Sequence, residues 1–343
     1  MFLLNDMWNI LHNIFVLLSG TIGNILSFII YSRPMFRNSM TSFLFRVLAV
    51  TDTLALNYGT WDNWLRYVRD GPVFTETKFY CKFSTYLRFL LADLPVWVLV
   101  LVSIERVIGV TVPHRARLLI TKKRTIGALI FLYIFLMCYN IPMYISPGSE
   151  VSTVGNVTIY KCKTTQEYRN LAYHVIPWMD LVIYALLPLL LMLVSSIIII
   201  TIVVRRKKML GAARSKSSDT NALTITLLTV CFVFMLLTLP HALYSLLIDP
   251  LWPSYRTKID FYAWRFLAGF LRYVNNAINF FLYCLSGQPF RKEFLKLLCF
   301  TSPKKDTLGN STHMTVISKS NVSNTSISQW KLVGTIFTKE SYL

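Results

Sequence analysis

Long apolar stretches separated by short polar connections run along most of this chain. The stretch at 181–204, LVIYALLPLLLMLVSSIIIITIVV, has no basic residue before Arg205, and 24 residues at about 1.5 Å each span the hydrocarbon core of a bilayer. Most stretches are interrupted by proline, glycine or a lone charge, which membrane helices tolerate when neighbouring helices satisfy the backbone. The pattern predicts an all-α bundle of seven transmembrane helices, at about residues 8–32, 40–68, 79–110, 125–146, 174–204, 220–248 and 261–286.

Composition agrees with this pattern. Charged residues make up 15% of the chain, against about 25% in soluble domains. The net charge of +19 does not indicate a nucleic-acid partner, because the basic residues gather on one side of the predicted bundle. Since cytoplasmic loops are enriched in Lys and Arg, this bias predicts a multi-pass plasma-membrane protein with an extracellular N-terminus and a cytoplasmic C-terminus. The connections after the first, third and fifth segments carry Arg33, Arg37, Arg115, Arg117, Lys122, Lys123, Arg124, Arg205, Arg206, Lys207, Lys208, Arg214 and Lys216.

Two further regions follow the seventh segment. The stretch GQPFRKEFLKLLCF (287–300) has apolar residues on one helical face and basic residues on the other, which is typical of a short eighth helix lying on membrane lipids. Cys299 at its end is either a palmitoylation site or a free buried thiol. We therefore expect a seven-helix membrane domain over 1–300 and a disordered cytoplasmic tail over 301–343.

Two of the six cysteines fall on the predicted extracellular side. Cys81 opens the third segment, and Cys162 lies between the fourth and the fifth. Because disulfides persist outside the cell, we expect Cys81 and Cys162 to pair. On the same side, the sequon NVT makes Asn156 a candidate glycosylation site.

Ionisable residues inside membrane segments are costly to bury and are usually functional. The sequence shows no His, Cys, Asp or Glu set with metal-ligand spacing, and no nucleophile elbow, P-loop or HExxH motif. We therefore expect no enzyme activity, no metal and no cofactor. The ionisable residues within the segments are Arg46, Asp52, Asp62, Arg88, Asp93, Glu105, Arg106 and Arg272, with Asp180 near an outer end.

The pair Glu105–Arg106 ends the apolar run DLPVWVLVLVSI. Arg106 follows Cys81 by 25 residues, about 37 Å along a helix, so the two residues belong to opposite membrane surfaces. Arg106 can pair with Glu105 and with acceptors on other helices, and breaking such a network would let the helices separate at the cytoplasmic face. The alternative is an interfacial arginine whose side chain snorkels into water.

Several motifs, taken in order, resemble those of the rhodopsin-like G-protein-coupled receptors over about residues 15–300. The resemblance implies heterotrimeric G proteins as partners. The matching motifs are GNILS around Asn24, LAVTD ending at Asp52, the Cys81–Cys162 pair, ERV at 105–107, Pro188, Phe234 with Pro240, NFFLY from Asn279 to Tyr283, and QPFRKEF.

The same resemblance implies roles for individual residues. Glu105, Arg106, Asn279 and Tyr283 correspond to the switch and coupling residues of the family. Asn24, Asp52 and Asn275 correspond to its polar cluster between the helices, and Phe234, Thr238 and Pro240 to the switch in its sixth helix.

The chain departs from the family pattern at several positions. Val107 replaces an aromatic residue, and Thr238 stands where the family usually has a tryptophan. Phe280 replaces a proline of the seventh helix, so we expect a softer kink there. Pro95 stands where a sodium-coordinating serine is common, which argues against a sodium ion at Asp52.

The expected ligand site is the outer half of the bundle. Amine receptors of the family bind an ammonium group through an aspartate seven residues after the third-helix cysteine, and that position here is Arg88. Arg88 favours an anionic or carbonyl-rich ligand group, and Arg272 adds a second base at similar depth. The alternative is internal pairing, of Arg272 with Asp62 and of Arg88 with Asp93 or a neighbour. The other candidate ligand contacts are Asp62, His241, Tyr244 and Tyr273.

The alternating stretch NVTIYKCKTT (156–165) predicts a β-hairpin lid over this site, which suits a peptide. The stretch ERVIGVTVPHRAR also resembles invertebrate neuropeptide receptors of the FMRFamide-receptor type. We therefore expect a receptor that responds to an extracellular neuropeptide. A receptor for a lipid or small carboxylate, a ligandless constitutive receptor and a seven-helix transporter remain as alternatives.

Overall fold

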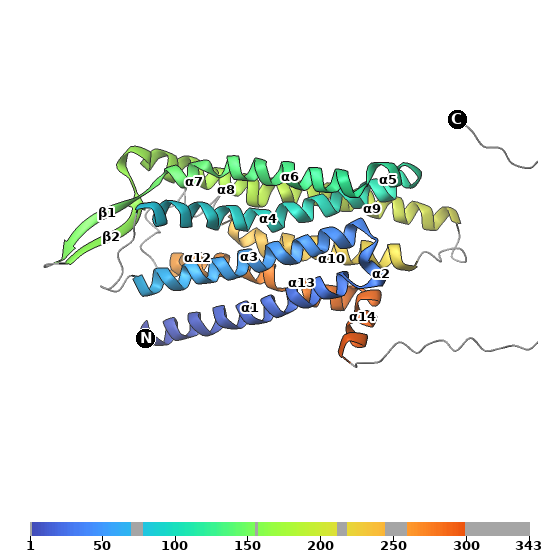
Figure 1. Cartoon of the computed structure of the whole chain (residues 1–343), viewed down its shortest axis with the longest axis horizontal. Coiled ribbons are helices and arrows are strands. Elements are labelled where there is room, and N and C mark those ends of the chain that lie inside the picture. Colours follow the sequence, from blue (N-terminus) through green and yellow to red (C-terminus); the bar gives the residue numbers. More distant parts are fainter. Residues whose placement is uncertain (1, 70–77, 155–156, 211–217, 244–258, 299–343) are drawn as a thin grey trace, which may run out of the picture. The chain divides into compact units, whose positions relative to one another are not determined.

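The described part of the chain is a bundle of long helices that run side by side (Figure 1). The structure is a computed structural model, and it describes residues 2–69, 78–154, 157–210, 218–243 and 259–298. These residues all belong to one compact unit, Met1–Phe300. The expected tail, residues 301–343, lies outside the described residues.

Helices occupy all seven predicted segments, with ends that differ by a few residues from the prediction. The predicted end of the sixth segment at 248 lies outside the described residues. The first four long helices are α1 (Phe2–Tyr31), α3 (Met40–Arg69), α4 (Lys78–Thr111) and α6 (Lys122–Tyr139), the last continued by α7 (Ile141–Ile145). The fifth consists of η2 (Leu171–Val175), α8 (Ile176–Asp180), η3 (Leu181–Leu186) and α9 (Leu187–Leu210); the sixth is α10 (Ser218–Leu243), and the seventh is α12 (Ile259–Ala277) with α13 (Asn279–Ser286).

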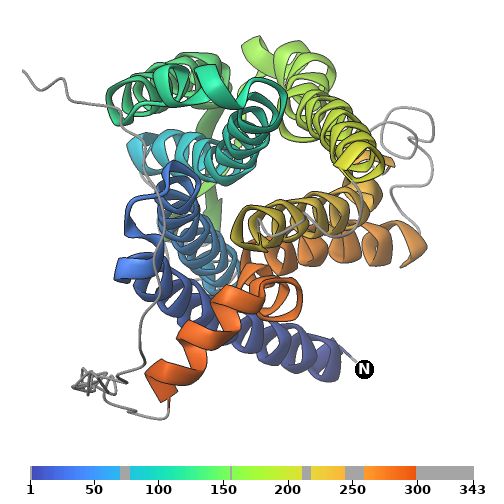
Figure 2. The ribbon, with the colours of Figure 1, turned by 90° about the vertical axis from the view of Figure 1, so that its right-hand side faces the viewer.

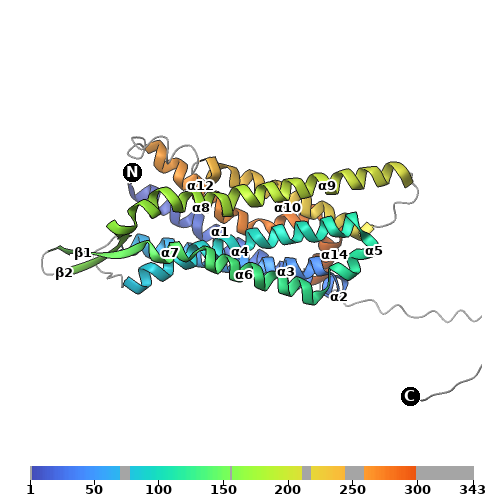
Figure 3. The same cartoon turned by 90° about the horizontal axis from the view of Figure 1, so that it is seen from above.

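Short elements cover the two ends of the bundle. At one end lie α2 (Pro34–Arg37), α5 (Pro113–Leu119) and α14 (Gln288–Leu298), and α14 crosses that end (Figure 2). At the opposite end, β1 (Pro147–Val154) and β2 (Val157–Thr164) form an antiparallel hairpin (Figure 3). A short 3-10 turn, η1 (Gln166–Tyr168), leads from the hairpin into the fifth helix. The pairing confirms the β-hairpin that the alternating pattern at 156–165 predicts, whereas its role as a lid stays a prediction.

Two prolines divide the fifth long helix. A proline has no N–H to donate to the carbonyl four residues earlier, so regular α-helical pairing cannot continue through it. Pro177 and Pro188 are the second residues of α8 and α9, and a π-helical turn, η2 or η3, precedes each of these helices. In η3, the carbonyl oxygen of Ile183 accepts a hydrogen bond of 3.1 Å from Trp97 Nε1 on α4. The proline positions therefore set where the fifth helix changes its backbone pairing.

The fourth and seventh helices are each interrupted once. The fourth breaks at Asn140, two residues before Pro142, where α6 gives way to α7. The seventh breaks at Ile278, between α12 and α13. This break occurs although Phe280 replaces the proline that rhodopsin-like receptors have in their seventh helix. Backbone hydrogen bonds from Ile278 to Val274 and from Leu282 to Ile278 persist across this break, which fits the expected soft kink.

The bundle packs around α4, which contacts α3, α6 and α9. On the other side of the bundle, two glycines let α1 approach the seventh helix closely. A Cβ atom on Gly20 would lie 2.5 Å from the Cβ of Ala277, and one on Gly23 would lie 2.9 Å from the Cβ of Phe280. Such contacts are shorter than real Cβ atoms allow, so this approach depends on glycine at both positions.

On length and composition alone, four stretches of described residues qualify as membrane spans: Ile14–Tyr31, Lys78–Thr111, Gln166–Arg206 and Thr224–His241. The remaining long helices are less apolar, and α3 carries both Arg46 and Asp52. Many outward side chains are apolar, such as Phe131 of α6, which is 74% exposed in the isolated chain. An apolar outer surface of this kind suits a lipid environment.

Candidate functional site

Buried polar side chains occur at three levels along the bundle: near the hairpin, in the middle and near α14. The level near the hairpin begins with the disulfide between Cys81, in the first turn of α4, and Cys162 of β2. Their Cα atoms lie 5.5 Å apart, within the range that a disulfide spans. The predicted pairing is confirmed, and it ties the hairpin to the start of α4.

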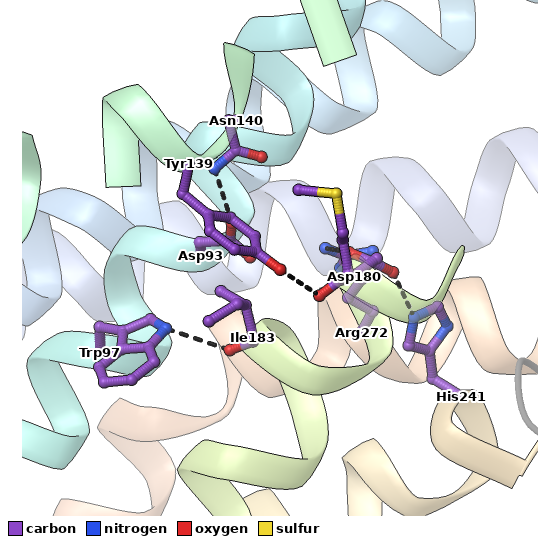
Figure 4. Close-up of polar contacts among 9 residues, drawn as sticks. Asp93, Trp97, Tyr139, Asn140, Asp180, Ile183, His241 and Arg272 are labelled. Atoms are coloured by element: carbon purple, nitrogen blue, oxygen red, sulfur yellow. Dashed lines mark hydrogen bonds and ion pairs between the residues drawn. The ribbon is translucent and has the colours of Figure 1, made fainter. Parts of the chain in front are cut away.

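Below the hairpin, four side chains from the fifth, sixth and seventh helices form one cluster, which we call the polar clasp: Asp180, Tyr184, His241 and Arg272. Figure 4 shows three of them, Asp180, His241 and Arg272. His241 Nε2 lies 3.1 Å from Asp180 Oδ2, and Arg272 Nη2 lies 3.6 Å from Asp180 Oδ1. The first contact is within hydrogen-bonding distance, and the second is an ion pair without a direct hydrogen bond. Asp180 therefore joins the fifth helix to both the sixth and the seventh.

Tyr184 lies one helical turn beyond Asp180 and contacts the same two partners. The Arg272 guanidinium carbon lies 3.7 Å from the Tyr184 ring centroid, a cation–π distance. The His241 ring meets the Tyr184 ring edge-on, with centroids 5.5 Å apart. The internal partner of Arg272 in the described structure is thus Asp180, whereas the side chain of Asp62, the partner considered from the sequence, lies outside the described residues.

A second buried pair lies beside the clasp. Asn140 Nδ2 donates to Asp93 Oδ2 at 2.9 Å, and both residues are buried. Close by, the Tyr139 hydroxyl donates to the Met179 carbonyl oxygen at 3.2 Å (Figure 4). At the break in the fourth helix, Asn140 therefore contacts α4, and Tyr139, the last residue before the break, contacts α8.

The other described candidate ligand contacts lie on α4 and on the seventh helix. Arg88 is partly exposed on α4, and its guanidinium carbon lies 4.9 Å from the Phe89 ring centroid. Tyr273 packs on Gly59 of α3, where a Cβ atom would lie 2.5 Å from Tyr273 Cε1. Three predicted site residues lie outside the described residues: Tyr244, Asn156 and Cys299.

The middle level joins α1, α3 and the seventh helix. Asn279 Nδ2 donates to Asp52 Oδ2 at 2.7 Å, and both residues are buried. Asn24 donates to the backbone oxygen of Asn276 at 3.0 Å, so its described contact is with the helix backbone and not with the Asp52 carboxylate. Asn275 is buried at the same level.

Two of the residues predicted to form a switch in the sixth helix, Phe234 and Thr238, are buried. Phe234 is fully buried in the main core, and Thr238 is 2% exposed. The Thr238 hydroxyl has no hydrogen-bond partner among the described residues. Pro240 lies inside α10, directly before His241, so the proline and the clasp histidine are adjacent.

The level near α14 contains the Glu105–Arg106 pair. Arg106 Nε lies 3.4 Å from Glu105 Oε2, and Arg106 also donates to the hydroxyl of Thr41 on α3. Thr41 in turn donates to Glu105. Arg106 is 8% exposed, so its side chain lies between helices and does not reach toward solvent.

At the same level, Tyr283 belongs to a cluster of aromatic rings. Its ring centroid lies 5.2 to 5.4 Å from those of Tyr31, Phe45 and Phe290. Phe290 belongs to α14, so the cluster anchors that helix to the bundle. An ion pair of 3.1 Å between Arg33 and the buried Glu293 adds a second anchor.

Sequence reasoning missed several of these residues. Asn140, Tyr184 and Thr41 are not charged residues and belong to none of the motifs that carry the family resemblance. An amide two residues before a proline in an apolar stretch, as in YNIPMY, is the signal that could have found Asn140. The i, i+4 spacing of Asp180 and Tyr184 could have placed them on one helical face.

Comparison of the sequence with known proteins identifies a family and several relatives. A family model described as 7 transmembrane receptor (rhodopsin family) matches residues 23–283. A probable G-protein coupled receptor of Caenorhabditis elegans is 24% identical over 295 residues, which is 82% of this chain and 67% of the relative.

Two other relatives are named for a peptide. The FMRFamide receptor of Drosophila melanogaster is 26% identical over 294 residues, which is 80% of this chain and 51% of that receptor. An FMRFamide peptide receptor of Caenorhabditis elegans is 26% identical over 129 residues, or 36% of this chain and 30% of the relative. The matched region thus spans about two thirds of the first relative and about half of the second.

Proposed function

Because this chain belongs to the rhodopsin family of seven-transmembrane receptors, we propose that it is a receptor for an extracellular neuropeptide. Family membership confirms the predicted seven-helix transmembrane bundle and a membrane receptor in place of an enzyme. The resemblance to FMRFamide receptors is likewise confirmed. Coupling to heterotrimeric G proteins is general to the family.

The observation that carries the proposal is that one helix, α4, connects both ends of the molecule. Its first turn holds the hairpin through Cys81, and its last turns hold the buried network of Glu105 and Arg106. Cys81 and Arg106 are separated by about 37 Å of helix. A ligand that moves the hairpin end of α4 can therefore change the packing around Arg106 without any additional element.

A peptide suits the hairpin end better than a lipid or small carboxylate does. The carboxylate alternative requires Arg88 and Arg272 to bind the ligand together, but Arg272 already pairs with Asp180 and stacks on Tyr184. The relatives named for FMRFamide support the same choice. We assign Arg88 and Tyr273 to the ligand site, with Arg88 binding a carbonyl-rich or anionic group of the peptide.

The proposed orientation follows the distribution of basic residues. The end with α2, α5 and α14 carries the basic connections and faces the cytoplasm, where the G protein binds. The hairpin end and the N-terminus face the extracellular space.

The proposal is tested by a screen of amidated peptides, including FMRFamide, on cells that express the chain, with calcium and cAMP read together. We expect a saturable response to at least one peptide, absent from untransfected cells. Silence toward every peptide at a verified surface level, together with a response to fatty acids, would instead support the lipid-receptor alternative.

A further inference from the structure

The polar clasp is a buried charged cluster to which the proposed function assigns no role. Asp180 and Tyr184 lie on one face of the fifth helix, and each contacts both His241 and Arg272. Three helices are therefore joined at one point by one hydrogen bond, one ion pair and two ring contacts. The neighbouring hydrogen bond from Asn140 to Asp93 joins only the fourth helix and α4.

The clasp residues are deeply buried for charged groups. The side chains of Asp180, His241 and Arg272 are 10%, 15% and 19% exposed. A charge at this depth is tolerated when a partner neutralises it, and removing one partner leaves the other exposed to an apolar environment. Separating the cluster would leave the charges of Asp180 and Arg272 without each other at this depth, so a closed arrangement is favoured over a partly opened one.

The clasp also lies where its helices deviate from regular α-helix. His241 follows Pro240 in the sixth helix. Asp180 ends α8, and Tyr184 belongs to the π-helical turn η3 that precedes Pro188. Helices bend most readily at prolines and π turns, so the clasp bridges points at which the fifth and sixth helices can move relative to each other.

Thr238 adds a reason for a clasp at this depth. The side chain is buried, but its hydroxyl has no hydrogen-bond partner among the described residues. An aromatic contact between the fifth and sixth helices is supplied by Tyr184 and His241. The clasp thus contributes polar and aromatic contacts that Thr238 does not make.

We propose that the polar clasp locks the resting conformation, and that Asp180 is the positioning residue that holds His241 and Arg272 in it. This inference rests on the proposed receptor function. Ligand binding separates the sixth helix from Asp180, which frees the opposite end of that helix to move away from Arg106. Because the contacts exist only in the closed state, weakening them disfavours the resting conformation more than the active one.

The first test is Asp180→Asn, measured for ligand-independent G-protein signalling at matched surface level. The amide keeps the shape of the side chain but removes its charge, so the resting state loses the ion pair with Arg272 and the carboxylate acceptor beside His241. We expect basal signalling to rise by about five-fold to ten-fold, as expected when a sparsely populated active state becomes substantially populated.

The second test restores the lock with a metal. In an Asp180→His variant, the new imidazole and native His241 can both reach a zinc ion, because His241 Nε2 lies only 3.1 Å from the present carboxylate and zinc–nitrogen bonds are about 2.0–2.1 Å long. Basal signalling should be high without zinc, return toward the wild-type level in micromolar zinc, and rise again with a chelator. The wild type and Asp180→Asn should not respond to zinc.

Tyr139→Phe is the matched control. It removes the hydrogen bond from the fourth helix to Met179, next to Asp180, but leaves every clasp contact in place. We expect wild-type basal signalling from this variant. A rise equal to that of Asp180→Asn would show that any loosening of α8 activates the receptor, and it would overturn the specific role of the clasp.

A readout without G protein separates this inference from the proposed function. An environment-sensitive fluorophore on Ile225→Cys, in a Cys138→Ala, Cys284→Ala and Cys299→Ala background, reports movement of the sixth helix, because Ile225 is exposed on α10. We expect Asp180→Asn to shift the emission, and zinc to reverse the shift in Asp180→His. If these shifts occur but no peptide or G protein responds, the proposed function fails and the lock stands. If Asp180→Asn matches the wild type in both readouts, the lock is refuted.

Discussion

At the scale of single residues, Arg106 is the side chain on which signal transmission depends in this account. It is buried between Glu105 and Thr41, so it can hold α4 to α3 in one state and become free for a partner in another. We predict that Arg106→Ala keeps peptide binding and loses G-protein activation, because the substitution lies about 37 Å from the hairpin end. Radioligand binding and nucleotide exchange on the same membranes measure the two effects; loss of both would indicate misfolding.

Arg88 is the corresponding residue at the hairpin end. If it binds a carbonyl or carboxylate of the peptide, truncation leaves that group unpaired at a cost of about 2–5 kcal/mol. Arg88→Ala should then weaken agonist potency by roughly thirty-fold or more, and Arg88→Lys should recover only part because lysine lacks the planar fork. Dose–response curves at matched surface level measure this. Unchanged potency in Arg88→Ala would exclude the assigned role.

At the scale of elements, the hairpin depends on its disulfide. Cys81 and Cys162 are 81 residues apart in sequence, and closing a loop of that length contributes about 4 kcal/mol in the chain-entropy model. We predict that Cys162→Ser abolishes surface expression or peptide binding, measured by antibody labelling of intact cells and by ligand binding. Wild-type binding at a normal surface level would contradict the role of the hairpin as a lid.

The π-helical turn η3 depends on a contact from α4. Trp97 Nε1 donates to the Ile183 carbonyl oxygen at 3.1 Å, in a turn where proline disturbs the regular pairing. Trp97→Phe keeps the apolar ring but removes the donor, so we expect the receptor to lose about 0.5–1.5 kcal/mol of stability with ligand affinity retained. A thermal unfolding series in detergent measures this, with Tyr133→Phe as a control because the Tyr133 hydroxyl has no hydrogen-bond partner among the described residues.

At the scale of the whole molecule, sequence patterns predict the helices well because a bilayer demands long apolar segments whatever the tertiary contacts are. The second strand of the hairpin was equally predictable, since strand alternation is local, whereas the sequence analysis did not identify the first strand, Pro147–Val154. The partners of buried charges were not: Arg272 pairs with Asp180, and Asn140 with Asp93, through contacts between helices that local sequence does not encode. Proline positions indicate where helices break, but not that π turns would place Tyr184 against His241.

The central claim is that a peptide bound at the hairpin end activates a G protein at the other end through Arg106. The most direct measurement is peptide-stimulated nucleotide exchange on a purified G protein, with membranes that contain either the wild-type receptor or Arg106→Ala at equal ligand-binding capacity. The account predicts that peptide accelerates exchange with the wild type and has no effect with the variant. Equal acceleration with both, or saturable peptide binding without exchange on any G-protein class, would contradict it.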